Sequence, residues 1–566
     1  MQVIRYDFIC KKLVSNVFKL ALTVPLLFIS TTLLAQSDHT GQTYPTGTFA
    51  ITKATVIQSP GQVVDSATVV IADGLIHSVG ADISIPNGAE VIDGTDLFIY
   101  PGFIDGMSNT GAARPEQMER PDNLFTPAPP NDYAGITPEM SVIGQIDVSE
   151  KSIANMRELG FTISHTVPYG RMLPGSGSLI LLSDEVASYD LLLKKDISMC
   201  TQFTGAPGAY PGNTLGIMAK WRNLYTQATY SKEHEQLYAG NPEGIQRPRQ
   251  DLALQAFYPV IDQTKHVFYH TNSMLEARRA MKLKDELNFR LVLSDLEEGW
   301  FLMDDLKDSD TRVLMSLNLP DEPEVSEDEE KTDDVLQLEQ RRQEAYNRFL
   351  SQYNEFNEAG ISYGFSTMGT TTNSIKDNLV KLVASGLSED AALAALTTDA
   401  AELLGISEIA GTLDAGKIGN AVITTAPYFQ EDSKVKYVFV DGDKYEYDTS
   451  ESASSEVSEE AAEVLLGSWD YAINTPQGEQ TGQWIFSDDG GSLVGLMTSN
   501  DGGPDTDMNN LTFLGGTLSF DFDFDAGGQS VEVVVMGDIS ESDFNGEASI
   551  AAFSMSIPVT ATKVPN

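Results

Sequence analysis

The stretch Phe98-Ile-Tyr-Pro-Gly-Phe-Ile-Asp-Gly-Met-Ser-Asn-Thr-Gly111 contains a short apolar run that stops at Asp105. Such a run predicts a buried strand that ends in a loop. In α/β barrels the carboxyl ends of the strands carry the chemistry. A metal hydrolase would have two histidines here, two residues apart, so that both imidazoles point the same way. This chain has Met107 and Asn109 instead.

The segments on either side of this stretch predict a barrel and a composite β-sandwich. Residues 47–98 are β-rich and include Asp73-Gly74, a dipeptide typical of tight hairpin turns. Within residues 99–409, helical patterns alternate with short apolar strands, which favours an α/β fold with a (β/α)8 barrel. Strands in residues 410–448 have no barrel position left. We therefore expect them to join residues 47–98 in the composite β-sandwich.

The last part of the chain predicts a second, all-β domain. Residues 449–466 are rich in Ser and Glu and have the composition of an acidic linker. Residues 467–566 contain alternating strands with Gly-rich turns, which predict a small antiparallel β-barrel or sandwich. An acidic run at residues 320–334 is typical of a solvated insertion.

The amino-terminal segment predicts export. Basic residues precede an apolar run that ends near Ala35, so residues 1–35 are expected to be a signal peptide, with a single uncleaved anchor helix as the alternative. We expect a periplasmic or extracellular protein without a membrane span after cleavage. Of the two cysteines, Cys10 lies in this segment, so Cys200 is left without a partner for an internal disulfide.

Charge narrows the classes of partner. The formal net charge is −46, which argues against nucleic acid and anionic membrane surfaces because like charges repel. Hydrophobic residues make up 41% of the chain, an ordinary value for a globular protein. A small-molecule ligand fits this composition better than a polyanion.

Two ends of the region 47–445 resemble the amidohydrolase superfamily, and in particular its imidazolonepropionase-like members. The opening contains Thr68-Val-Val-Ile-Ala-Asp-Gly-Leu-Ile-His-Ser-Val-Gly80 and Pro101-Gly-Phe-Ile-Asp105. The close contains Gly386-Leu-Ser-Glu-Asp-Ala-Ala-Leu-Ala-Ala-Leu-Thr397 and Gly411-Thr-Leu-Asp-Ala-Gly-Lys417. The resemblance implies a TIM-like barrel with a divalent metal centre, flanked by a β-sandwich from both chain ends, that hydrolyses non-peptide carbon–nitrogen bonds.

The resemblance also implies which residues would hold the metal, and most of them are replaced. The positions of the paired first-strand histidines, the fifth-strand histidine, the sixth-strand histidine and the late aspartate fall on Met107, Asn109, His270, Asp295 and Met368. Lys220 is a formal candidate for the family's bridging lysine, but it lies in a predicted helix. Thioether and amide groups are poor ligands for hard divalent ions.

These replacements predict a catalytically degenerate member of the superfamily. In the family the metal activates a water molecule and the late aspartate acts as base. One histidine and one carboxylate are fewer than the three protein ligands of a catalytic zinc site. We therefore expect no bound zinc or other divalent metal. Should a metal bind after all, His270 and Asp295 are the residues left to hold it.

Two alternatives stay open. The first is an active hydrolase with a rearranged centre, in which Asp295 and His270 carry the chemistry, or in which Ser108, His270 and Asp295 form a nucleophilic set. The second is a non-catalytic ligand-binding protein or partner subunit, in a homo-oligomer or in a hetero-oligomer with an active paralogue. Ligand contacts are then expected from Asn109 and from Arg171, which lies in a Gly-rich segment able to approach an anion.

Overall fold

A computed structural model describes residues 42–44, 47–115, 120–121, 123–184, 187–307, 309–323, 332–449, 464–475, 478–489, 492–500, 506–514, 516–525, 530–540, 542–550 and 555–564. The predicted signal peptide, most of the predicted acidic linker and much of the acidic run at 320–334 lie outside these residues. No helix in the described part of the chain is long and apolar enough to cross a bilayer.

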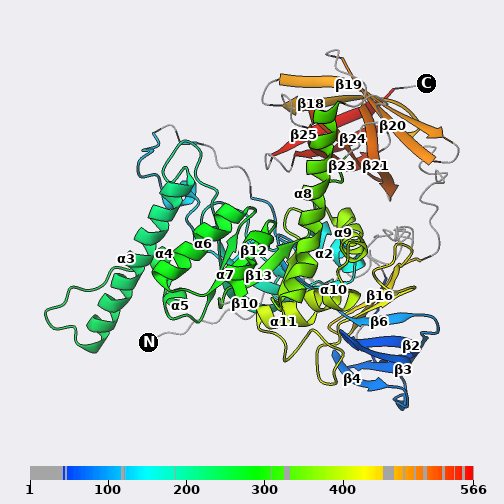
Figure 1. The fold of residues 1–566 in the computed structure, drawn as a ribbon, viewed down its shortest axis with the longest axis horizontal. Helices are drawn as coiled ribbons and strands as arrows, with labels where there is room; N and C mark the ends of the chain where they lie inside the picture. Colours follow the sequence, from blue (N-terminus) through cyan, green and yellow to red (C-terminus); the bar gives the residue numbers. More distant parts are fainter. Residues whose placement is uncertain are drawn as a thin grey trace, which may run out of the picture. The chain divides into compact units, whose positions relative to one another are not determined.

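A nine-stranded sheet combines strands from before and after the barrel (Figure 1), in the order β1-β17-β16-β15-β6-β2-β3-β4, with β5 beside β2. Its strands are β1 (Gln42–Tyr44), β2 (Phe49–Ser59), β3 (Gln62–Ala72), β4 (Leu75–Gly80), β5 (Glu90–Asp93), β6 (Phe98–Pro101), β15 (Ala421–Thr424), β16 (Val435–Val440) and β17 (Asp443–Glu446). Three interstrand steps separate β2 from β16, about 14 Å in a flat sheet. The rings of Phe49 and Phe439 are nevertheless only 5.2 Å apart, so the sheet curls around its own apolar core.

The second sheet forms the TIM-like barrel, in the order β14-β13-β12-β11-β10-β9-β8-β7. Its strands are β7 (Phe103–Ser108), β8 (Phe161–Thr166), β9 (Gly175–Leu181), β10 (Leu192–Gln202), β11 (His266–His270), β12 (Leu291–Leu296), β13 (Arg312–Ser316) and β14 (Tyr363–Ser366). The expected barrel departs from the regular (β/α)8 pattern at one strand. β9 runs antiparallel to both β8 and β10, because its connections are too short for a parallel crossover.

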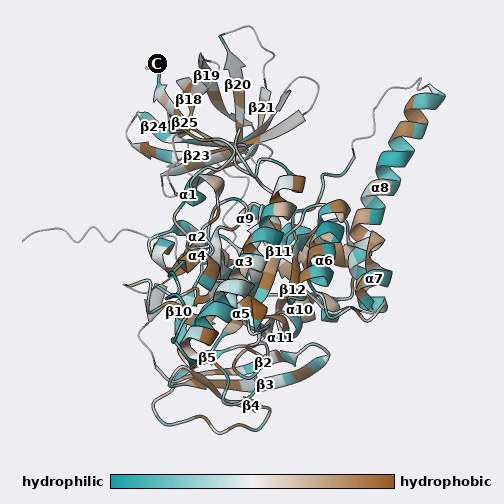
Figure 2. Cartoon of the chain, turned by 90° about the vertical axis from the view of Figure 1, so that its left-hand side faces the viewer, coloured by the Kyte–Doolittle hydropathy of each residue, from teal (hydrophilic) through white to brown (hydrophobic). Residues whose placement is uncertain are grey.

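The helices of this region lie between and after the barrel strands in the chain, and several pack against the outward faces of those strands. They are α1 (Asn131–Ala134), α2 (Lys151–Glu158), α3 (Thr214–Gly240), α4 (Leu252–Gln255), α5 (Tyr258–Ile261), α6 (Met274–Leu287), α7 (Met303–Lys307), α8 (Asp333–Glu358), α9 (Thr372–Ala384), α10 (Glu389–Leu396) and α11 (Thr398–Leu404), with short 3-10 turns η1 (Val142–Gln145) and η2 (Gly299–Phe301). Figure 2 shows hydrophobic and hydrophilic residues alternating along α8, as expected for an amphipathic helix. Its buried residues join the same core as the outward faces of the strands.

Asp105 ties together the ends of the barrel sheet, where β14 meets β7. Its Oδ1 accepts hydrogen bonds from the Thr367 backbone N–H (3.2 Å) and hydroxyl (3.1 Å), just after β14. Its Oδ2 accepts from the Ser164 hydroxyl on β8 at 2.8 Å. Gly106 permits the close approach, since a Cβ there would lie 2.5 Å from the Phe365 carbonyl oxygen. The stretch that follows Pro101 therefore closes the barrel.

The carboxyl-terminal strands form a closed antiparallel barrel of their own, in sequential order. They are β18 (Gly467–Thr475), β19 (Gly478–Asp489), β20 (Ser492–Ser499), β21 (Thr506–Leu514), β22 (Thr517–Asp525), β23 (Ser530–Ser540), β24 (Asp543–Ile550) and β25 (Met555–Lys563). Trp484 on β19 contacts Phe520 on β22 and Phe544 on β24, with ring centroids 5.1 Å apart in both pairs. Because these strands are not neighbours, the indole fills the inside of the barrel.

Candidate functional site

His270 and Asp295 form a hydrogen-bonded pair at the carboxyl ends of β11 and β12. The imidazole Nε2 lies 3.1 Å from Asp295 Oδ2, and Nδ1 lies 3.2 Å from Gln202 Oε1 at the end of β10. The Gln202 amide nitrogen donates to the Gly170 carbonyl, which leaves Oε1 as the acceptor that faces His270. Both ring nitrogens therefore face acceptors, and this arrangement suits an imidazolium that donates twice.

A kink in β12 turns the Asp295 side chain toward His270. The pairing of β12 with β13 shifts register between Leu293 and Leu296, and Asp295 has φ +60°. A bulge of this kind bends the strand and re-aims a side chain, and aspartate is among the few residues that adopt positive φ readily. The local strain, about 1–3 kcal/mol, is typical of positions held for a purpose other than stability.

Acidic side chains surround the pair. Glu276 lies in the first turn of α6, and Glu297 and Glu298 follow β12. Burial opposes protonation of His270, but the hydrogen bond and charge of Asp295, together with Glu276 and Glu297, raise the pKa of His270 above its ordinary value. Burial and then the charge of Asp295 raise the pKa of Glu297 to about 7. The strand ends thus carry an excess of negative charge.

Three buried oxygens beside the pair have no hydrogen-bond partner in the described residues. They are Thr271 Oγ1, Ser294 Oγ and Asp295 Oδ1. The Thr271 backbone N–H donates to the Ser294 carbonyl at 3.0 Å, so the ends of β11 and β12 lie side by side here. Buried polar atoms are nearly always hydrogen-bonded, so a cluster of exceptions calls for an explanation.

The side chains at the other positions where the family has metal ligands make different contacts. The Met107 side chain is buried among apolar residues of the barrel interior. The Asn109 amide donates to the Val167 carbonyl at 2.7 Å. Met368 packs partly buried against the same apolar cluster as Met107. None of the three side chains presents a charged ligand to His270.

The residues present do not fit the family's metal centre. A metal-bound histidine needs a lone pair on the ligating nitrogen, whereas both nitrogens of His270 face acceptors. Throughout the described residues, no group of three or more His, Cys, Asp or Glu side chains is arranged to hold a metal ion. No catalytic step is therefore assigned to a metal at this site.

Several predicted contacts are not brought to the pair. The Ser108 hydroxyl bonds to Thr110 Oγ1 at 2.7 Å and to Ser164 Oγ at 3.1 Å, so it is not joined to His270 as a nucleophile. Arg171 donates to the Tyr133 carbonyl at 3.2 Å, although its neighbour Gly170 contacts Gln202. Lys220 lies in α3, as its helical surroundings predict.

Sequence reasoning missed Gln202, Glu276 and Glu297. Gln202 ends β10, which pairs in parallel with β11 so that Gln202 lies opposite His270. Glu297 follows Asp295 in the printed sequence, but only the kink in β12 brings its charge to the pair. Carboxylates close to the ends of two adjacent parallel strands were the available signal.

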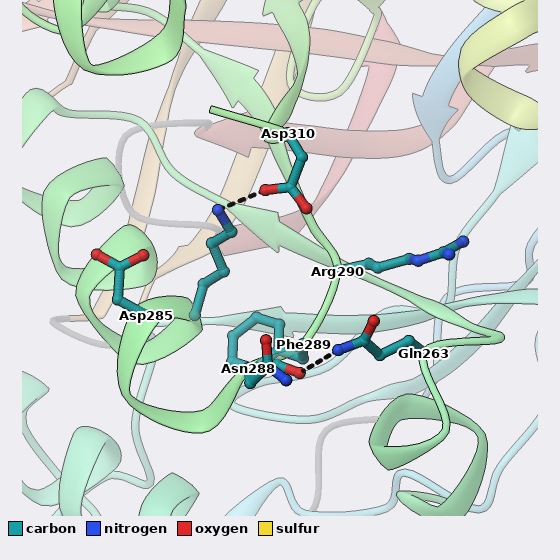
Figure 3. A pocket seen from close by; sticks show the side chains of 7 residues that line it. Gln263, Asp285, Asn288, Phe289, Arg290 and Asp310 are labelled. Carbon is teal, nitrogen blue, oxygen red and sulfur yellow. Dashed lines mark hydrogen bonds and ion pairs between the residues drawn. The ribbon is translucent and has the colours of Figure 1, made fainter. Parts of the chain in front are cut away.

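A hollow lies at the opposite end of the same strands (Figure 3). Its volume is about 250 Å³, and it is lined by residues that precede β11, β12 and β13, among them Gln263, Phe289 and Asp310. Lys284 and Asp310 form an ion pair at 2.5 Å, and the Arg290 side chain extends away from that pair. In barrels of this kind the amino-terminal face of the strands serves stability, so this hollow is not the candidate active site.

Comparison with known proteins finds one family match and several similar folds. The family model described as the amidohydrolase family matches residues 332–445. An amidohydrolase from Thermotoga maritima MSB8 is similar over 70% of this chain and 98% of its own, with 19% identity and a TM-score of 0.58. A mutant of atrazine chlorohydrolase from Arthrobacter aurescens TC1 has a TM-score of 0.41, with 14% identity over 71% of this chain and 96% of its own. No curated protein matches the chain in sequence.

The fold and the matched segment agree. The family match falls on α8 to β17, the part that completes the barrel and returns to the composite sheet. The similarity to the Thermotoga amidohydrolase takes in 98% of that protein's chain. Residues 332–445 therefore match the amidohydrolase family, and the chain shares the fold of the Thermotoga amidohydrolase.

Proposed function

We propose that this protein is a non-hydrolytic, small-molecule-binding member of the superfamily. The observation that carries the proposal is the His270 ring, which spans Gln202 Oε1 and Asp295 Oδ2 at the place where a metal ligand would be expected. The carboxyl ends of β11 and β12 carry buried polar atoms without hydrogen-bond partners in the described residues, which suits recognition of a ligand. They lack the charged ligands that would activate a water molecule.

Zinc retention and hydrolysis together test this proposal. The purified protein is dialysed against zinc and then against buffer, and bound metal is measured by mass spectrometry. Hydrolysis is assayed with N-acyl amino acids, cyclic amides and cyclic amidines. We expect no stoichiometric zinc and no turnover. Stoichiometric zinc that is lost in His270→Asn but kept in His77→Asn, an exposed histidine on β4, would contradict the proposal.

The rival function, a hydrolase with a rearranged centre, makes a different prediction. Asp295 and His270 would act as an acid–base pair, because a histidine held by a carboxylate is a common general base. Turnover without added metal that Asp295→Asn abolishes would establish this rival and exclude the binding-only role. We expect Asp295→Asn to leave the hydrolysis assays at background.

A further inference from the structure

We propose that the ligand bound at the carboxyl ends of β11 and β12 is a small organic cation. Its ammonium group binds between Asp295 Oδ1 and the neighbouring glutamates. This inference rests on the proposed binding function and names the chemical class of its ligand.

One oxygen of the Asp295 carboxylate has no hydrogen-bond partner among the described residues. Oδ2 is occupied by His270, whereas Oδ1 is buried without a partner, and the side chain is only 6% exposed. The oxygens of Thr271 and Ser294 lie unpartnered next to it in the sequence and at the ends of the same two strands. All three atoms can accept hydrogen bonds, and an ammonium group offers three donors and no acceptor.

The charged groups around Asp295 are mostly negative. The charged groups that act on Glu297 are Asp295, Glu298 and Glu276, opposed by His270. A single imidazolium does not balance these carboxylates. An anionic ligand would be repelled, and a neutral ligand would leave Asp295 Oδ1 without a charged partner.

The arrangement of oxygens at these strand ends favours an ammonium group over a divalent metal ion. Hard divalent cations need several oxygen ligands in a defined arrangement. In the part of the chain that the structure describes, no group of three carboxylates or histidines offers one. Glu298 is already engaged, because its Oε2 accepts the Met274 backbone N–H at the start of α6. An ammonium group needs only hydrogen-bond acceptors, and Asp295 Oδ1 is a buried, charged acceptor without a partner in the described residues.

The test measures ligand-dependent thermal shifts and calorimetric affinities on the full chain. The probes are methylammonium, putrescine and agmatine, with 1,4-butanediol as the neutral counterpart of putrescine, succinate as the anionic one and magnesium chloride as the metal alone. The key variant is Asp295→Asn, which keeps an acceptor for His270 and tolerates positive φ. The control is Glu243→Gln, which removes one charge from an exposed loop.

We expect at least one ammonium probe to stabilise the protein and butanediol and succinate to have no effect. Asp295→Asn should weaken the binding about tenfold to a hundredfold, as for a lost hydrogen bond to a charged group, and Glu243→Gln should not. Absence of binding by all three ammonium probes would overturn the inference, as would stabilisation by magnesium or succinate alone, or equal affinity in Asp295→Asn. The zinc and hydrolysis assays use other readouts, so a failure of the proposed function can be distinguished from a failure of this inference.

Discussion

His165 is a histidine that works by staying neutral. It lies inside the barrel, where Nδ1 donates to the Gly106 carbonyl and Nε2 accepts from the Ser198 hydroxyl, each at 2.8 Å. The Phe268 ring packs against it with centroids 4.6 Å apart. Burial lowers the pKa of His165 to about 4, so the ring is uncharged at neutral pH.

This burial predicts a loss of stability in acid. The unfolded chain takes up a proton near pH 6.5, whereas folded His165 does so only near pH 4, so its contribution is full above pH 6.5 and is lost as the pH falls. Over this window wild type should lose about 3 kcal/mol more than His165→Gln, at roughly 1.4 kcal/mol per pKa unit. Urea unfolding at a series of pH values measures the difference. Parallel curves for the two proteins would contradict this assignment.

Asp105 makes the stability depend on pH in the opposite direction to His165. Burial raises its pKa, although the hydroxyls of Ser108, Ser164 and Thr367 partly offset the effect. The folded state therefore holds the proton more tightly than the unfolded chain does. Stability from this group is present below about pH 4, the ordinary pKa of aspartate, and is lost as the pH rises through the folded pKa.

We expect wild type to lose stability relative to Asp105→Asn as the pH rises above 4. The slope should approach about 1.4 kcal/mol per pH unit until the carboxyl is ionised. The same urea series measures it, with His165→Gln as the variant of opposite slope. A difference between wild type and Asp105→Asn that does not change with pH would show that Asp105 is not perturbed by burial.

At the residue scale the sequence predicts the pair but not its surroundings. His270 and Asp295 come together because the fifth and sixth strands of the expected barrel are parallel neighbours, which the family pattern implies. Gln202 was missed because no strand was expected at Leu192–Gln202, the segment that pairs with β11. The role of Asp105 was missed because its partners Ser164 and Thr367 are distant in sequence.

At the element scale, β9 explains a Gly-rich segment that the sequence analysis associated with an anionic ligand. Gly177 lies in β9, where a Cβ would sit 2.6 Å from His165 Nε2 and 2.7 Å from Ser198 Oγ. The glycine is required by the close approach of β9 to the buried His165–Ser198 pair. Glycine composition alone could not distinguish this packing role from a loop that approaches a ligand.

A methyl group at Gly177 should therefore destabilise the barrel. We expect Gly177→Ala to lower the free energy of unfolding by about 1–3 kcal/mol, as for an overpacked core. Gly144→Ala is the matched control, because nothing lies within 4 Å of its Cβ position. Guanidinium unfolding compares the two variants. An unchanged midpoint for Gly177→Ala would mean that β9 does not approach His165 as described.

At the scale of the whole molecule, a buried arginine joins the barrel to the composite sheet. Arg157 on α2 is fully buried, and its NH1 lies 2.7 Å from Asp184 Oδ1. The guanidinium stacks over the Tyr445 ring of β17 at 3.8 Å, and Nε donates to the Tyr447 hydroxyl at 3.2 Å. One planar cation therefore holds segments that are far apart in sequence.

Lysine cannot reproduce this set of contacts. We expect Arg157→Lys to lower the free energy of unfolding by about 3 kcal/mol, because the planar fork and the stacking are lost while a charge stays buried. Arg222→Lys is the control, since Arg222 pairs with Glu286 in a more exposed position and should change stability by about 0–1 kcal/mol. Equal midpoints for both variants would contradict a linking role for Arg157.

The sequence predicts which segments form the sheets better than it predicts how those sheets close or curve. Alternating strands at residues 467–566 indicate an all-β unit, but only the pairing of β18 with β25 makes it a closed barrel rather than a sandwich. The composite sheet follows from late strands that have no barrel position. Its curl, shown by the contact of Phe49 with Phe439, depends on side chains from strands that are not adjacent.

The central claim is that His270 serves as a hydrogen-bonded partner of Asp295 and Gln202 rather than as a metal ligand. Nitrogen NMR of the full chain with labelled histidine tests it most directly, because only six histidines are present and His270→Asn assigns the signal. At about pH 6 we predict two protonated ring nitrogens for His270, unchanged by added zinc. A zinc-dependent shift of one His270 nitrogen to the range of a metal ligand would contradict the account.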